Sequence, residues 1–111
     1  MDIETFREYC LTKDLVTEEL PFGPDTLVFK VGGKIFSLCD INTFESINLK
    51  CNPEYAVTLR EKYPDTILPG YHMNKNHWNT VLTHLPDQLL LELIDHSYCL
   101  VKESLPKKYF S

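Results

Sequence analysis

The segment from Gly70 to Asn79 concentrates side chains that can recognise an anion or a planar group. It holds two histidines, three asparagines, two aromatic rings and a lysine, and it contains no acidic residue. Cationic and amide groups donate hydrogen bonds to phosphate or carboxylate oxygens, and aromatic faces stack on nucleobases. A polar hairpin tip with packed rings has the same composition, so both interpretations stand. The candidate ligand-binding side chains of this segment are Tyr71, His72, Asn74, Lys75, His77 and Trp78.

Further candidate ligands of an anion lie on the strands expected before this segment. Lys30 and Lys50 are predicted to extend from the sheet face opposite the core, where they can join Lys75 in one positive patch. Lys34 follows a hairpin turn, and Asn48 alternates outward together with Lys50 along one strand. Taken singly, a lysine of this kind is usually an ordinary solvated side chain.

Other chemistries lack the residue patterns that they need. There is no nucleophile motif such as Gly-x-Ser-x-Gly, and Gly32-Gly33 lies in a hairpin rather than between a strand and a helix, as a phosphate loop requires. No cofactor and no catalytic activity are therefore expected. An enzyme hypothesis would depend on His72, His77 and Lys50, the one credible acid–base cluster.

The cysteines and histidines do not have the spacing of metal ligands. No Cys-x-x-Cys pair occurs, and the four histidines lie in unrelated contexts, so no metal site is expected. Free cysteine behaves as a small hydrophobic residue, which predicts reduced core thiols. The four cysteines are Cys10, Cys39, Cys51 and Cys99.

Length and charge limit the classes of function. The 111 residues, 43% of them hydrophobic, suit one domain spanning residues 1–111. Sixteen acidic residues against eleven basic ones give a net charge of −5, so a nucleic-acid site would have to be local. No apolar run approaches the about 20 residues of a membrane span, and no signal-peptide pattern opens the chain. A cytoplasmic protein without membrane contact is expected.

The first half of the chain predicts a helix, a short strand and a hairpin. Asp2 can cap a helix that runs to about Lys13, and a brief strand is expected around Val16 to Glu19. A two-residue turn at Gly32-Gly33 predicts a hairpin over residues 26–40 in which Phe29 faces Phe36 on the core side. The opposite face of this hairpin is expected to present Val28, Lys30, Ile35 and Ser37.

The second half predicts three strands and two helices. Residues 45–51 alternate as a strand, and Asn52 and Pro53 begin a helix that ends near Tyr63. Residues 67–73 and 77–82 form two extended segments, and the last helix runs from Pro86 toward Pro106. The expected order is α-β-β-β-α-β-β-α. The predicted fold class is α+β, a two-layer α/β sandwich with helices on one face of an antiparallel sheet.

Several motifs together resemble the MmcQ/YjbR family of small bacterial proteins. The motifs are Glu18-Glu19 before Pro21-Phe22-Gly23, Phe29-Lys30-Val31, Ser46 to Cys51, Leu68 to Lys75, His77-Trp78-Asn79 and Leu105-Pro106-Lys107-Lys108. The resemblance implies a secretion-chaperone-like or frataxin-like fold. It also implies a "double wing" DNA-binding protein, whose wings would be the hairpins around Gly32-Gly33 and around Asn74 to Asn76.

Two binding functions follow as hypotheses. The first is a non-enzymatic protein that binds DNA through the basic side chains named above, with Trp78 or Tyr71 stacking on or bordering the ligand. The alternative is a protein-interaction or chaperone-like module that uses the open sheet face, where Val28 and Ile35 supply apolar surface. Such a face can bind another protein or a second copy of the chain.

Overall fold

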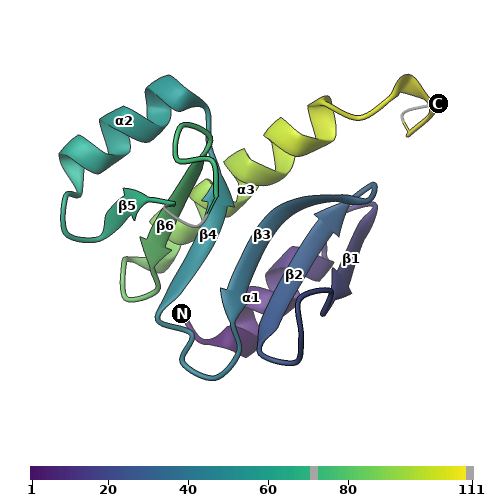
Figure 1. Cartoon of the computed structure of the whole chain (residues 1–111), viewed down its shortest axis with the longest axis horizontal. Helices are drawn as coiled ribbons and strands as arrows, with labels where there is room; N and C mark the ends of the chain where they lie inside the picture. Colours follow the sequence, from purple (N-terminus) through teal and green to yellow (C-terminus); the bar gives the residue numbers. More distant parts are fainter. Residues whose placement is uncertain (71–72, 110–111) are drawn as a thin grey trace.

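The computed structural model describes residues 1–70 and 73–109. Its six strands form one antiparallel sheet in the order β1-β2-β3-β4-β6-β5 (Figure 1). The strands are β1 (Val16–Glu19), β2 (Thr26–Val31), β3 (Lys34–Asp40), β4 (Ser46–Lys50), β5 (Ile67–Pro69) and β6 (Trp78–Leu82). The helices are α1 (Ile3–Leu11), α2 (Pro53–Lys62) and α3 (Asp87–Glu103), followed by the 3-10 helix η1 (Lys107–Tyr109).

The predicted fold class is confirmed, with one more strand than the expected order contains. The brief strand expected around Val16 to Glu19 was not counted in that order, and it pairs with β2 along its whole length as an edge of the sheet. The element order is therefore α-β-β-β-β-α-β-β-α.

The helix starts follow from local capping. The Asp2 carboxylate accepts a hydrogen bond from the Thr5 amide nitrogen at 2.8 Å and begins α1. The Asn52 side-chain oxygen accepts from the amides of Glu54 and Tyr55 at 2.9 and 3.2 Å, and Pro53 occupies the first turn of α2. Both starts were predicted from the sequence. The first helix ends at Leu11, two residues before the predicted end.

The hairpin of β2 and β3 contains a bulge that the sequence analysis missed. Val31 lies opposite Lys34, as expected, but the register shifts and places Phe29 opposite Ser37. The expected pairing of Phe29 with Phe36 is therefore wrong, because Phe36 is the extra residue of a β-bulge. A one-residue shift exchanges the two faces of a strand, so Ser37 is buried on the helix side instead of lying on the open face.

All three helices cover one face of the sheet. In Figure 1, α1 and α3 lie behind the strands, and α2 packs near β5. The buried side chains of the helices and of this face form one core, which includes Phe6, Phe29, Phe36, Ile47, Ala56, Leu59, Val81, Leu90 and Ile94.

The cysteine prediction holds for three of the four residues. Cys10, Cys39 and Cys51 are buried free thiols, whereas Cys99 is exposed on α3, so the expectation of a core thiol is wrong there. Burial raises the pKa of Cys39 to about 12 and that of Cys51 to about 11. These buried thiols remain protonated and unreactive at neutral pH. No helix of the described residues is long and apolar enough to cross a membrane.

Candidate nucleic-acid interface

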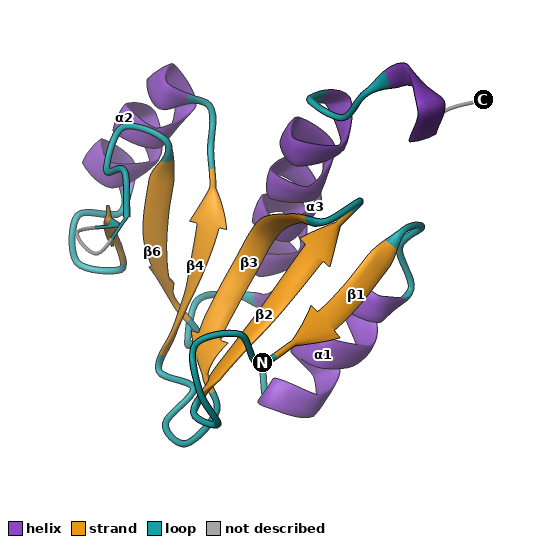
Figure 2. Ribbon diagram, turned by 45° about the vertical axis from the view of Figure 1, so that its right-hand side comes forward, coloured by secondary structure: helices purple, strands orange, loops and turns teal. Residues whose placement is uncertain are grey.

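The antiparallel order brings both predicted wings to the same end of the sheet. Strand β3 runs away from the Gly32-Gly33 turn, β4 returns toward it, and β6 runs away again, so the β5–β6 connection lies beside that turn. The start of α2 and the end of α3 reach this end too (top of Figures 1 and 2). We call it the hairpin end. The opposite end holds the N-terminus and the connections at residues 20–25, 41–45, 63–66 and 83–86, and we call it the loop end.

Charged residues separate between these two ends. At the hairpin end, the described connections and element termini carry Lys34, Lys50, Lys75, Lys102, Lys107 and Lys108 against Asp14, Glu54 and Glu103, and Lys13 is paired there with Asp95. The loop end carries Asp2, Glu4, Glu19, Asp25, Asp40, Glu45, Glu61, Asp65 and Asp87 against Lys62. The net charge of −5 therefore hides a positive end and a negative end.

Two of the predicted lysines lie at the hairpin end without a charged partner. Lys50 ends β4 on the open face, opposite Trp78, and Lys75 is exposed in the β5–β6 connection. Within the described parts of the chain, neither ammonium group makes a hydrogen bond or an ion pair. Lys34 is exposed beside the Gly32-Gly33 turn, where its Nζ lies 3.4 Å from the Ser104 carbonyl oxygen. These three side chains are available to an anion.

Two other predicted residues, Lys30 and Asn48, make contacts within the sheet. The Nζ of Lys30 lies 3.2 Å from Glu19 Oε1, and this contact lowers the pKa of the Glu19 carboxyl. The charge of Lys30 is thus balanced within the open face. The Asn48 side-chain oxygen accepts a hydrogen bond from Thr80 Oγ1 at 2.7 Å, which links β4 to β6. The Lys30 ammonium group and the Asn48 side-chain oxygen are therefore engaged within the sheet.

The aromatic residue Trp78 of the predicted site is packed into the protein. Trp78 is only 9% exposed, so the packed-ring interpretation applies to it and its ring is not free to stack on a base. Gly70 lies so close that a Cβ atom there would be 3.0 Å from the Trp78 Cβ. Tyr71 and His72 lie outside the described residues.

The two polar residues of the β5–β6 connection differ in their roles. The Asn74 side-chain oxygen accepts a hydrogen bond from the Asn76 amide at 3.0 Å and so shapes the turn. The His77 side chain is exposed, and its carbonyl oxygen accepts from the Cys51 amide at 2.8 Å. His77 can therefore present its ring beside Lys75 at the hairpin end.

Arg60 on α2 positions the β5–β6 connection. Its Nε donates to the side-chain oxygen of buried Asn79 at 2.7 Å, and its Nη2 donates to the Lys75 carbonyl oxygen. The sequence analysis missed this residue, because an arginine on an exposed helix face has the pattern of a solvated charge.

Ser97 on α3 joins two strands at the hairpin end. Its buried Oγ donates to the Phe36 carbonyl oxygen at 2.5 Å and accepts from the Lys50 amide at 2.9 Å. The β3–β4 register ends one residue earlier, at Ser37 and Leu49, so Ser97 supplies hydrogen bonds where the bulge interrupts the ladder. Ser97 could have been identified from the sequence, because it is a serine within the apolar stripe of the last helix.

The expected apolar surface of the open face is much reduced. Val28 lies on that face with its side chain between those of neighbouring strands, yet it is 0% exposed. The alternative function through this face therefore loses Val28 as a contact, because a buried side chain offers nothing to a partner.

Residues 11–100 of the chain match the family model YjbR. The chain is 41% identical to the Escherichia coli O157:H7 protein YbdF over 95% of this chain and 88% of that protein. It is 30% identical to YjbR of Escherichia coli K12 over 97% of this chain and 93% of that one.

Solved structures show the same fold. The Deinococcus radiodurans protein DR2400, with its DUF419 domain, is 38% identical and superposes with a TM-score of 0.90, covering 96% of this chain and 83% of that one. A Pseudomonas syringae protein is 32% identical with a TM-score of 0.77, covering 91% of this chain and 99% of that one. The resemblance predicted from the motifs is confirmed, and this protein belongs to the YjbR family.

Proposed function

We propose that this protein is a non-enzymatic binding protein that engages DNA at its hairpin end. The observation that carries the proposal is the separation of charge between the ends of one sheet. An acidic chain binds a polyanion only where its local field is positive, and the hairpin end provides that field.

The geometry fits contacts to the phosphate backbone. Lys34 lies at one hairpin and Lys75 at the other, and Lys50 lies on the strand between them. Lysine ammonium groups bind phosphate as point charges and carry no base code, so the binding should have little sequence preference. The exposed His77 adds a hydrogen-bond donor beside Lys75.

The loop end orients the complex. Its carboxylates repel phosphate, so the duplex can approach from the hairpin end only. Because the positive patch is small, the affinity should be modest and sensitive to salt. With about three phosphate contacts, affinity should fall about 40-fold between 50 and 200 mM salt.

The proposal is tested by fluorescence anisotropy of a labelled duplex of about 20 base pairs at about 50 and 200 mM salt. The double variant Lys50→Gln/Lys75→Gln should weaken binding and flatten the salt dependence. Lys62→Gln is the control for the loss of a lysine charge, since it removes one from an exposed helix terminus at the loop end. The proposal fails if no binding occurs at low salt, or if the control weakens binding as much as the double variant does.

A further inference from the structure

A groove lies toward the loop end, between α1 and the edge strand β1. Its volume is about 490 Å³, and its apolar wall comes from Ile3, Leu20, Leu27 and Ile41. Leu20 is 51% exposed, and Phe22 next to it is largely exposed as well. Exposed apolar side chains beside an apolar groove are typical of an interaction site.

The backbone of β1 next to this groove has unpaired hydrogen-bonding groups. The Leu15 carbonyl oxygen accepts from the Gly32 amide at 3.1 Å, which makes these two residues a hydrogen-bonded pair. Pairs alternate in an antiparallel ladder, so the amides and carbonyls of Val16 and Glu18 point away from β2. No strand of the described residues pairs with that side of β1. An extended segment can therefore add to the sheet there.

The two edges of the sheet differ in this respect. The other edge strand, β5, has three residues, and one of them is Pro69, which has no amide hydrogen to donate. Such a strand is protected against pairing with another chain. The edge at β1 contains neither proline nor lysine.

The charges around the groove define the occupant. Glu4, Glu18 and Glu19 line it; Arg7 of the wall is paired with Glu18, and Lys30 of the open face is paired with Glu19. Glu4 has no basic partner among the described residues, so the surroundings of the groove carry net negative charge. A second copy that paired through its own β1 would bring a second set of glutamates to the same edge, which is unfavourable. A segment rich in lysine or arginine would instead be attracted.

We propose that β1 and this groove bind an extended, basic segment of a partner protein that carries a bulky apolar side chain. The segment adds to the sheet through the outward groups of Val16 and Glu18. Its apolar side chain enters the groove beside Leu20, and a basic side chain lies near Glu4. The groove shares no residue with the proposed DNA site and lies toward the loop end, whereas β1 itself runs from the hairpin end to the loop end.

A synthetic probe tests this assignment. The probe is a labelled peptide of about nine residues in which lysine alternates with valine around a central phenylalanine, and its control has glutamate in place of lysine. The lysine peptide should bind saturably and slow the hydrogen exchange of the Val16 and Glu18 amides. The glutamate peptide should bind at least about tenfold more weakly.

Two matched variants locate the site. Leu20→Asp should weaken binding of the lysine peptide at least about tenfold, because it places a charge in the apolar wall. Val57→Asp makes the same change at a residue with similar exposure, 49%, on α2, and it should have no effect. Circular dichroism checks that both variants are folded. Lys50→Gln/Lys75→Gln should leave peptide binding unchanged, which separates this result from the DNA test.

Three results would overturn the assignment: no binding of the lysine peptide, equal binding of the glutamate peptide, or exchange protection that falls outside β1. A stable dimer in sedimentation that Leu20→Asp dissociates would also overturn it. That result would assign the groove to a second copy of the chain.

Discussion

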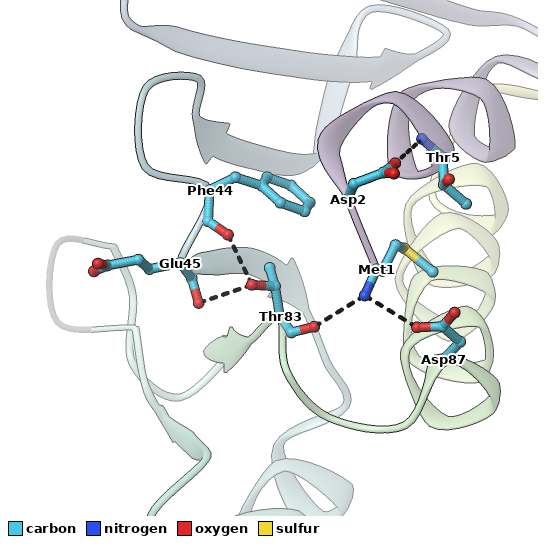
Figure 3. Close-up of polar contacts among 7 residues, drawn as sticks. All are labelled: Met1, Asp2, Thr5, Phe44, Glu45, Thr83 and Asp87. Carbon is cyan, nitrogen blue, oxygen red and sulfur yellow. Dashed lines mark hydrogen bonds and ion pairs between the residues drawn. The ribbon is translucent and has the colours of Figure 1, made fainter.

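The two ends of the sheet use their charged residues differently. At the loop end, carboxylates complete the fold. The Asp2 carboxylate caps α1, Asp40 accepts from the Asn42 and Thr43 amides at 2.7 and 3.1 Å, and Asp87 lies 3.1 Å from the Met1 amino group (Figure 3 shows the contacts of Asp2 and Asp87). At the hairpin end, Lys50 and Lys75 have no such partner among the described residues.

This difference shows why the overall charge is a poor guide to the ligand. At the loop end, several carboxylates accept hydrogen bonds in helix caps and turns or form ion pairs. Lys50 and Lys75, which have no charged partner among the described residues, lie at the other end. The electrostatic field at a surface, and hence the ligand that it attracts, depends on the local distribution of charge. The net charge is a sum over both ends and does not show this distribution.

Within the hairpin end, the largest effect is expected from removing the hydroxyl that bridges β3 and β4. Ser97→Ala leaves the Phe36 carbonyl and the Lys50 amide without their partner, which should lower the free energy of unfolding by about 2–4 kcal/mol. Urea unfolding measures this loss. Ser104→Ala is the control, because its exposed hydroxyl bonds locally to Val101 and should matter by less than about 0.5 kcal/mol. Equal stabilities of the two variants would refute the bridging role.

Arg60→Met should have the next largest effect, again at the hairpin end. It removes the hydrogen bonds to Asn79 and to the Lys75 carbonyl, so we expect a loss of about 1–3 kcal/mol and faster amide exchange in residues 74–77. The affinity for DNA should also fall, because the backbone of Lys75 loses the hydrogen bond that positions it. Lys62→Met, two positions along α2 and exposed, should leave exchange in this connection unchanged. Unaltered exchange in Arg60→Met would contradict the positioning role.

The pH dependence of the free energy of unfolding should distinguish His96, which contacts the start of α2, from the carboxylates of the loop end. Burial lowers the pKa of His96 from its usual 6.5, and its Nε2 accepts a hydrogen bond from the Asn52 amide at 3.2 Å. Below about pH 6.5 the unfolded chain therefore binds a proton that the folded chain does not, and stability falls as the pH drops through this window. The carboxyls with lowered pKa, Asp2, Glu18 and Glu19, respond only below the usual carboxyl values near 4.5.

This dependence is measured by urea unfolding at about pH 7.5 and about pH 5.5, in the parent chain and in His96→Gln. The parent should lose stability over this interval, and the variant should lose less. If both lose the same amount, another group carries the dependence.

The smallest effect is expected at the α1–β1 turn of the hairpin end. Leu15 has a φ of 66° and an exposed side chain, so Leu15→Gly relieves strain but increases the freedom of the unfolded chain. The free energy of unfolding should change by less than about 0.5 kcal/mol.

Phe44 is the counterpart at the loop end, with a φ of 44°. Its ring packs against Phe6 at a centroid distance of 5.4 Å, so Phe44→Gly should cost about 2–4 kcal/mol. Thermal unfolding compares the two variants, and a similar cost at both positions would contradict this account.

The local sequence determined the elements themselves. Asp2, Asn52 and Pro53 predicted two helix starts correctly, and the Gly32-Gly33 pair predicted the turn between β2 and β3. The apolar stripe of α3 also appeared where its three- and four-residue spacing placed it. In each case the physical cause lies within a few residues of the chain, so a reading of the sequence can find it.

The tertiary structure alone decided the site. The bulge at Phe36, the burial of Trp78 and the pairing of Lys30 with Glu19 each depend on which strands lie side by side. The separation of charge depends on strand direction, because residues distant in sequence meet at one end only after the antiparallel order is set. Long-range packing therefore decides which of the predicted lysines remain free for a ligand.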